Sequence, residues 1–215
     1  KTTKDKNLVE NVIRELIKTK IFKKKKIIFR KKNLGIKKNI LNGVNYVFKK
    51  FDKIIVLEDD LEVSKNYLSI TNKLLRIYKK DNKIFTLTGY SLPNRYLNKQ
   101  NIDHNFYSCK RPSSWGWATW KNKWNILSKI KSKKISNLNY GNDLALMQQK
   151  KLLKELDSWA FDWTEKHINN SKYCIYPKYA LIKNNGDDKY STNNFFRLKK
   201  FKEQIKTFNY KELSL

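Results

Sequence analysis

The pattern of apolar and polar positions along the chain predicts helices that alternate with strands. Apolar residues recur at helical spacing over Asp5–Lys20 and again over Ile36–Phe51. The short apolar runs Lys26–Arg30 and Ile54–Leu57 follow these two segments and are typical of strands. Helix, strand, helix, strand is the order found in βαβ units, which build parallel sheets. We therefore expect an α/β fold with a mostly parallel sheet.

The same alternation continues toward the C-terminus. We expect further helices over Tyr67–Tyr78, Ser158–Asn170 and Arg197–Phe208, and strands over Ile84–Ser91, Phe106–Lys110, Tyr173–Pro177 and Ala180–Ile182. The segment Asn33–Gly35 is predicted to be a turn, with Gly35 in a conformation closed to other residues. A length of 215 residues without a repeat or a linker indicates one domain, and no apolar run is long enough to span a bilayer.

Three acidic residues, Glu58, Asp59 and Asp60, directly follow the apolar run Ile54–Leu57. In open α/β sheets, ligands bind beyond the carboxyl ends of the strands. Three adjacent carboxylates repel one another, so we expect a cation, a sugar hydroxyl or a backbone amide to meet them. The alternative is structural: Asp59 or Asp60 caps a helix that starts near Ser64.

Tryptophan is concentrated in one part of the chain. Four of the six tryptophans, Trp115, Trp117, Trp120 and Trp124, follow Ser113-Ser114 within a short stretch. Such a cluster can fill a hydrophobic core, or its flat rings can line a pocket in which they stack on sugar rings. The small residues between the rings favour the pocket. The other two tryptophans, Trp159 and Trp163, bracket Asp162 on a predicted helix, where we expect them to desolvate its carboxylate and raise its basicity. The alternative is that Asp162 is an exposed helix acid that pairs with a lysine such as Lys166, four residues later.

The charge of the chain is strongly positive, with 48 Lys and Arg against 19 Asp and Glu, a net charge of +29. Such a charge is compatible with nucleic acid or anionic lipid as a partner. Arginine, which reads phosphates and bases through its bidentate fork, is sparse, so the lysines are better explained as a solvated surface with some attraction to anionic lipid. Cys109 and Cys174 suggest neither a zinc site nor a disulfide scaffold, which fits the reducing cytoplasm. Together with the positive charge, we expect a cytoplasmic protein that is peripheral at the inner face of the membrane.

Several motifs together resemble a known family. The segments IIVLEDDLEVSKNYL, SSWGWATW and SWAFDW, followed by CIYP and NNGDD, occur in the same order as in inverting glycosyltransferases of the A fold. They are similar to bacterial family 2-like sugar transferases and, more distantly, to the N-acetylglucosaminyltransferase that begins complex N-glycans. The resemblance covers about Asn7 to Asn194. It implies the Rossmann-like fold of the nucleotide-diphospho-sugar transferases, with a mostly parallel sheet.

The resemblance also implies a reaction. A sugar would pass from a nucleotide-sugar, in our expectation a UDP-sugar, to an acceptor hydroxyl with inversion, assisted by Mn²⁺ or Mg²⁺, in the synthesis of a surface polysaccharide or glycoconjugate. The expected partners are this donor, a glycan or lipid-linked acceptor and an anionic membrane surface, with no specific nucleic acid. Residues 1–92 would form the nucleotide-sugar-binding part, residues 93–195 the acceptor and catalytic part, and residues 196–215 a basic C-terminal helix.

Individual roles follow from the matching motifs. Asp60 would meet the cation, and Glu58 and Asp59 complete the acidic metal-and-ribose motif. Asn33 and Gly35 would approach the nucleotide base, and Asp162 would be the general base. The acceptor and sugar pocket would include Trp115, Gly116, Trp117 and Trp163.

Two departures from the family leave other functions open. Members of the family begin with a strand, a helix and a second strand, and the corresponding sequence is missing before Lys1. Because the only methionine is Met147, we expect the numbering to begin inside a longer product. The segment Asp187–Thr192 also lacks the Gly-rich, His-ending pattern of relatives. The alternatives are a basic nucleic-acid-binding module whose tryptophans stack on bases, and an inactive remnant that binds a glycan or nucleotide.

Overall fold

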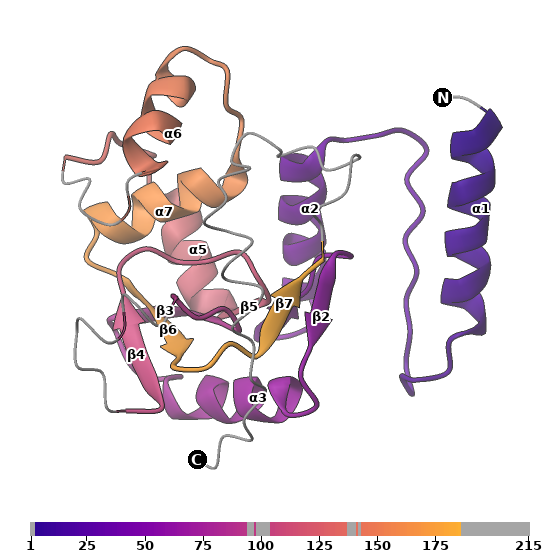
Figure 1. Cartoon of the computed structure of the whole chain (residues 1–215), viewed down its shortest axis with the longest axis horizontal. Coiled ribbons are helices and arrows are strands. Elements are labelled where there is room, and N and C mark those ends of the chain that lie inside the picture. Colours follow the sequence, from indigo (N-terminus) through magenta and orange to yellow (C-terminus); the bar gives the residue numbers. More distant parts are fainter. Residues whose placement is uncertain (1–2, 94–96, 98–103, 137–140, 142, 186–215) are drawn as a thin grey trace. The chain divides into compact units, whose positions relative to one another are not determined.

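The computed structural model describes residues 3–93, 97, 104–136, 141 and 143–185 (Figure 1). The chain divides into two compact units, residues 1–35 and residues 36–215. The sequence contains no Gly-, Pro- or Ser-rich linker at this boundary, which is why it did not indicate the division. The two units are described separately below. No helix within the described ranges has the length and apolar character needed to cross a membrane.

The first unit consists of one helix and an irregular segment. Helix α1 (Thr3–Lys18) confirms the helix expected over Asp5–Lys20. The strand predicted at Lys26–Arg30 is wrong, because this segment has no regular secondary structure. A strand requires a neighbour for its backbone hydrogen bonds, and apolar composition alone does not supply one. The segment is instead attached to α1 by Lys25, whose Nζ donates to the carbonyls of Leu16, Ile17 and Thr19 at the end of the helix.

The second unit contains the remaining elements. In chain order they are α2 (Ile36–Phe48), β1 (Lys53–Val56), β2 (Leu61–Val63), α3 (Tyr67–Ile77), β3 (Ile84–Thr88), β4 (Phe106–Cys109), β5 (Trp117–Trp120), α5 (Lys121–Lys129), α6 (Asp143–Leu152), α7 (Trp159–Asn169), β6 (Tyr173–Pro177) and β7 (Ile182–Asn184). The predicted elements at α2, α3, α7, β1, β3, β4 and β6 are confirmed to within a few residues. The elements β2, β5, α5 and α6 were not predicted, and the predicted helix at residues 197–208 lies outside the described residues.

The unit is α/β, but its main sheet is mostly antiparallel rather than mostly parallel. The five strands have the order β1-β5-β3-β6-β4, in which only the β3–β6 pair of this described sheet is parallel. Strands β1, β3 and β6 do run in one direction, since β1 and β3 are each antiparallel to β5 and β3 is parallel to β6. The helix-containing connections predicted from the alternation therefore exist. The antiparallel strand β5 lies between β1 and β3, and its sequence WATW was interpreted as part of a pocket.

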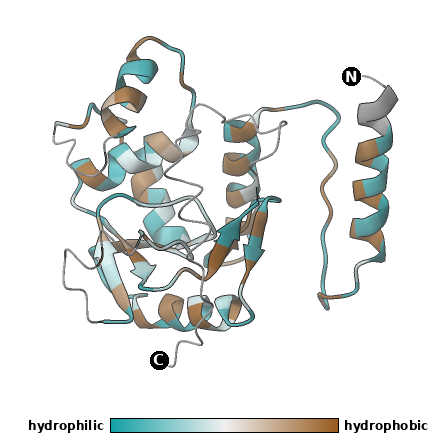
Figure 2. Ribbon diagram, viewed as in Figure 1, coloured by the Kyte–Doolittle hydropathy of each residue, from teal (hydrophilic) through white to brown (hydrophobic). Residues whose placement is uncertain are grey.

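Helices cover both faces of this sheet (Figure 1), and the strands alternate between two cores. On β5, Ala118 and Trp120 pack with α3, whereas Trp117 packs with α2, α5 and α7. Successive side chains of a strand point to opposite faces, so a strand covered on both faces is apolar throughout. This explains why β3 is buried along its whole length. Figure 2 shows the same pattern in the mixed hydropathy of the covering helices, each of which has one hydrophobic side.

Candidate functional site

The acidic triplet lies at one end of the main sheet together with two other loops. In the register of the strands, Val56 of β1 and Thr88 of β3 both lie opposite Trp117 of β5. The residues after Val56, the residues after Thr88 and the residues before Trp117 therefore leave the sheet at the same end. These residues include Glu58–Asp60, Gly89–Tyr90 and Trp115–Gly116. The loops are joined directly, since the amide of Gly89 donates to the carbonyl of Gly116 at 2.8 Å.

Asp60 is held in place by the two-stranded sheet of β2 and β7. Its Oδ2 accepts a hydrogen bond from Asn184 Nδ2 at 3.2 Å, and its carbonyl accepts one from the amide of Asn185 at 2.8 Å. Its Oδ1 is shielded from solvent and has no hydrogen-bond partner among the described residues. Buried polar atoms are nearly always paired, so this oxygen calls for a partner such as a water molecule, a cation or a ligand group.

Glu58 carries the strongest signature of charge crowding in this loop. Burial, followed by repulsion from Asp60 and then Asp59, raises the pKa of Glu58 to about 7. When several carboxylates lie close together and are partly shielded from water, the state in which all of them are ionised is disfavoured. A cation at this end of the sheet would relieve the same repulsion.

The helix-capping interpretation of the acidic residues is wrong. Helix α3 begins after Asn66, which is its N-cap residue and makes no capping hydrogen bond with its side chain. Strand β2 lies between Asp60 and this helix. The acidic residues are therefore available for another role.

The floor of this end of the sheet is tightly packed around Gly116. This glycine has a φ of +53°, and a Cβ atom added to it would lie 1.7 Å from Cδ1 of Ile182 and 3.1 Å from the hydroxyl oxygen of Tyr67. Gly89 is equally constrained, with a Cβ position 2.6 Å from Cδ1 of Ile182. Only glycine at these positions lets the loops approach β7 this closely.

Most of the tryptophans form a core cluster and not a pocket wall. The rings of Trp117 and Trp124 are 5.8 Å apart, those of Trp117 and Trp159 5.2 Å, and those of Trp124 and Trp163 4.6 Å. The exposed fractions of Trp117 and Trp163 are 1% and 6%. Their predicted place in the sugar pocket is thus corrected, because their faces are covered by other rings.

Trp115 differs from these four tryptophans. It is only partly buried, and its ring meets that of Tyr90 edge to face at 5.0 Å between centroids. Its carbonyl accepts a hydrogen bond from the Thr88 hydroxyl at 2.8 Å, which fixes the loop before Gly116. Of the four residues predicted for the sugar pocket, Trp115 and Gly116 therefore lie at the acidic end of the sheet.

Asp162 lies in a group of opposite charges. Its Oδ1 accepts from Lys151 Nζ at 2.6 Å, and its Oδ2 is 2.9 Å from Lys37 Nζ. Lys151 also contacts Glu165, and Lys37 contacts Asp157 at 2.5 Å. The partners of Asp162 come from α6 and α2, and not from Lys166, which sequence spacing offered as a structural partner.

The basicity expected of Asp162 is wrong in sign. Burial beside Trp159 and Trp163 tends to raise the pKa of the carboxyl group, as we expected, but hydrogen bonds from Lys151 and Lys37 outweigh this effect. The pKa of Asp162 is consequently below its usual value, and its side chain is 23% exposed.

Asn33 and Gly35, the residues predicted near the nucleotide base, belong to the first unit. There the amide of Gly35 donates to Oδ1 of Asn33 at 2.8 Å, and Gly35 has a φ of +74°. The predicted turn and its glycine conformation are confirmed. The nucleotide-binding role of this turn stays a prediction.

Sequence reasoning missed the residues that hold the site from a distance. Asn184 and Asn185 were noted only as part of the NNGDD motif, yet they bond to Asp60, more than one hundred residues earlier in the chain. Lys37 and Lys151 were not singled out at all, because one lysine among so many gives no signal. Only the resemblance to a known family, which includes both the acidic segment and NNGDD, pointed to a connection.

Within the ranges that the structure describes, no group of three or more His, Cys, Asp or Glu side chains is arranged to hold a metal ion. A cation bound near Asp60 would therefore depend on one or two carboxylates, with its other ligands from substrate and water, as is usual for Mg²⁺ bound with phosphates. Neither a protein-family model nor a curated protein matches this sequence.

Proposed function

We propose that the protein is a metal-assisted inverting glycosyltransferase that moves a sugar from a UDP-sugar to an acceptor hydroxyl. The observation that carries this proposal is the buried, unpartnered Oδ1 of Asp60 at the end of the sheet where three loops meet. We further propose the A fold of these enzymes, for which the common direction of β1, β3 and β6 is the supporting feature.

Asp60 is the residue proposed to hold Mn²⁺ or Mg²⁺, with Glu58 and Asp59 beside it for the cation or the ribose hydroxyls. The orphaned oxygen of Asp60 and the crowded charge around Glu58 fit a hard cation, which prefers oxygen ligands. Such a cation, when bound, neutralises the charge of a diphosphate leaving group. Asn184 orients the carboxylate through its other oxygen.

Trp115 and Tyr90 are proposed to contact the sugar. Both residues are partly exposed. Tyr90 follows the end of β3 and Trp115 precedes the start of β5, at the end of the sheet where the acidic loop lies. An aromatic face next to a sugar ring excludes water and packs on its C–H groups. Gly116 supports this role. Because it has no side chain, Ile182 can pack directly against its backbone, and this contact holds the loop that carries Trp115.

Asp162 is proposed as the general base that accepts the proton of the acceptor hydroxyl during attack on the anomeric carbon. Lys151 and Lys37 keep the carboxylate ionised and oriented, but they also lower its affinity for a proton. Each carboxylate oxygen contacts one ammonium group and keeps a second lone pair, which can accept the hydrogen bond of the acceptor hydroxyl without displacing Lys151 or Lys37.

The biological setting is proposed from the resemblance: synthesis of a surface polysaccharide or glycoconjugate on a glycan or lipid-linked acceptor, in the cytoplasm. The alternative of a nucleic-acid module with base-stacking tryptophans loses its main support, because Trp117, Trp124, Trp159 and Trp163 are buried.

The reaction can be tested by measuring UDP release from a panel of UDP-hexoses and UDP-N-acetylhexosamines, with Mn²⁺ and with chelator. We expect release for one donor class, only with the metal, and a product whose anomeric configuration is opposite to that of the donor. Binding of UDP-sugar without release or transfer under any of these conditions would identify the inactive remnant instead.

A further inference from the structure

Helix α1 exposes an apolar face. Its apolar residues recur every three or four positions, and their exposed fractions are 56% for Leu8, 50% for Val9, 59% for Val12, 45% for Leu16 and 61% for Ile17. Figure 2 shows hydrophobic and hydrophilic residues on different sides of this helix. An apolar stripe of this length on one helix normally packs against something.

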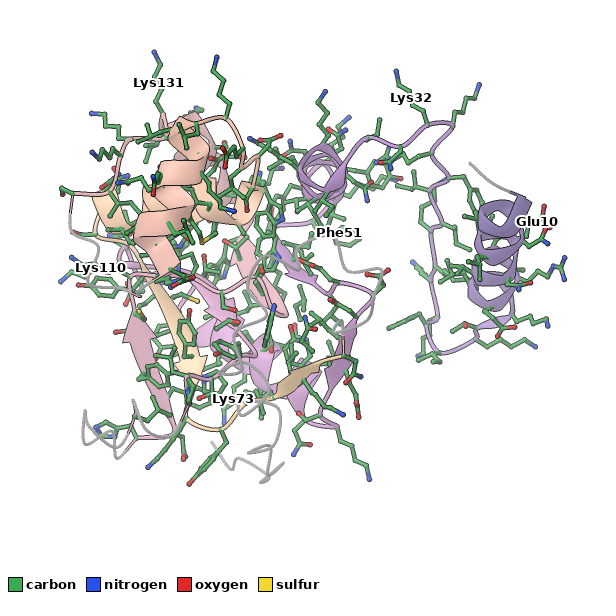
Figure 3. The ribbon with its side chains drawn as sticks, turned by 45° about the horizontal axis from the view of Figure 1, so that its top comes forward. Glu10, Lys32, Phe51, Lys73, Lys110 and Lys131 are labelled. Carbon is green, nitrogen blue, oxygen red and sulfur yellow. The ribbon has the colours of Figure 1, made fainter. Side chains whose placement is uncertain are left out.

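The opposite side of α1 is polar and internally paired. Arg14 lies 3.7 Å from Glu10, and Lys18 lies 3.8 Å from Glu15, both at helical spacing. In Figure 3, Glu10 projects from the side of α1 that faces away from the irregular segment after the helix. The helix is therefore amphipathic, with charges of both signs on its polar side.

A strongly basic segment, residues 20–32, follows the helix. It carries exposed cationic side chains at Lys20, Lys23, Lys24, Lys25, Lys26, Arg30, Lys31 and Lys32 and no acidic residue. Four large apolar side chains are exposed among them: Ile21 at 81%, Phe22 at 63%, Ile28 at 41% and Phe29 at 59%. Lys25 fastens this segment to the last carbonyls of α1, so the positive charge stays next to the apolar stripe.

We propose that α1 and the basic segment form a binding element for anionic lipid bilayers. The apolar stripe and the Ile21–Phe22 pair would enter the interface between headgroups and acyl chains, while the lysines contact lipid phosphates. An amphipathic helix alone or a polybasic segment alone binds membranes weakly, and the two together bind through both area and charge.

The combination of features favours lipid over nucleic acid. The phosphates of a nucleic acid would attract the same lysines, but a nucleic acid offers no apolar surface to cover the stripe on α1. The basic segment is also dominated by lysine, whereas sequence-specific reading of bases relies mainly on the bidentate fork of arginine. The proposal does not depend on the proposed enzymatic reaction, and the assay below involves neither donor nor cation.

Vesicle co-sedimentation of the whole chain tests the apolar stripe. The variant Leu8→Gln/Val12→Gln/Leu16→Gln keeps good helix formers and removes the stripe. The matched control, Ile77→Gln/Ile126→Gln/Leu152→Gln, changes three exposed apolar residues on helices of the second unit. With vesicles of phosphatidylcholine and phosphatidylglycerol, we expect the first variant to bind at least tenfold more weakly and the control to stay within about twofold of the parent.

A second pair of variants tests the charge. Replacing four lysines by glutamine at Lys20, Lys23, Lys24 and Lys26 should also weaken binding at least tenfold, since each lysine near an anionic surface contributes about a fivefold factor. The control replaces four exposed lysines of the second unit, Lys49, Lys50, Lys79 and Lys80, and so removes the same net charge. We expect it to bind nearly as well as the parent.

Four results would overturn the proposal. One is equal loss for both lysine sets, which would mean that only the overall charge attracts lipid. Another is unchanged vesicle binding by the triple apolar variant. The third is a fall in the unfolding temperature of that variant without lipid, beyond the fall seen in its control, because the stripe would then pack within the protein itself. Tighter binding to DNA than to vesicles at physiological salt would likewise contradict it.

Discussion

His167 should make the stability of the second unit depend on pH. Its ring is fully buried, with Nε2 2.8 Å from the hydroxyl oxygen of Thr86 and Nδ1 2.9 Å from the carbonyl oxygen of Trp163. A carbonyl can only accept, so Nδ1 carries the proton and Nε2 accepts from Thr86, which describes a neutral imidazole. Burial is the main cause that lowers the pKa of His167 to about 4.

The sign and size of the effect follow from this pKa. In the unfolded chain, His167 has its ordinary pKa of 6.5 and binds a proton as the pH falls below that value. In the folded protein, it binds this proton only near pH 4. The contribution of His167 to the free energy of unfolding therefore falls as the pH falls through this window, opposite in sign to that of Glu58, whose pKa is raised to about 7. Relative to about pH 7, the loss from His167 is about 2 kcal/mol at about pH 5 and about 3 kcal/mol at about pH 4.

Urea denaturation followed by tryptophan fluorescence at about pH 7 and about pH 5 measures this loss as the difference between the parent and His167→Gln, because other titrating groups such as Glu58 change both proteins equally. His167→Gln keeps a donor and an acceptor but does not titrate, so its stability should lack the loss of about 2 kcal/mol. His104→Gln, a change at the exposed histidine, should behave like the parent. Equal losses in the parent and in His167→Gln would refute the reasoning. If that variant does not fold, an NMR titration of the parent serves, and a His167 pKa near 6.5 would refute it.

Two further substitutions test the candidate site. Asp162→Asn should leave UDP binding intact and lower sugar transfer by about 10²–10⁴-fold in a UDP-release assay. Asp157→Asn changes the exposed carboxylate that also contacts Lys37, and it should leave both UDP binding and transfer unchanged. A parent-like transfer rate would make Asp162 a structural ion-pair residue. Gly116→Ala should lower the free energy of unfolding by about 2 kcal/mol or more, because it strains a positive φ and collides with Ile182. Gly43→Ala, on a helix with open space, should instead be neutral or stabilising by up to about 1 kcal/mol, and similar urea midpoints for the two would contradict the packing described for Gly116.

Periodicity predicted the elements with local causes. The helices α2, α3 and α7 each bury one stripe of apolar side chains, and that stripe is visible in the sequence. Ser158 even accepts a hydrogen bond from the amide of Phe161 as an N-cap, at the position where the predicted helix begins. For such elements the local pattern and the tertiary environment agree.

Features that depend on distant partners could not be predicted. The direction of β5 is decided by its position between β1 and β3, and nothing within WATW distinguishes a strand buried on both faces from aromatic residues around a pocket. Lys26–Arg30 has the composition of a strand but lacks a pairing neighbour in the structure. Element type was therefore easier to predict than topology.

The site shows the same division. Local composition located the acidic loop and the glycine of the Trp115–Gly116 segment. The sign of the Asp162 pKa shift depends on Lys37 and Lys151, which come from two other helices, so the neighbouring tryptophans gave the wrong answer. Charge contacts of this kind are set by the fold and leave no periodic trace in the sequence.

Calorimetric titration of the protein with UDP, with and without Mn²⁺, tests the central claim most directly. Asp60 is proposed to hold the cation against the diphosphate, so binding of the parent should be much tighter with Mn²⁺. Asp60→Asn should abolish this difference, whereas Asp52→Asn, at the exposed residue just before β1, should preserve it. Metal-supported binding of UDP that survives unchanged in Asp60→Asn, or the absence of any metal dependence in the parent, would contradict the proposed site.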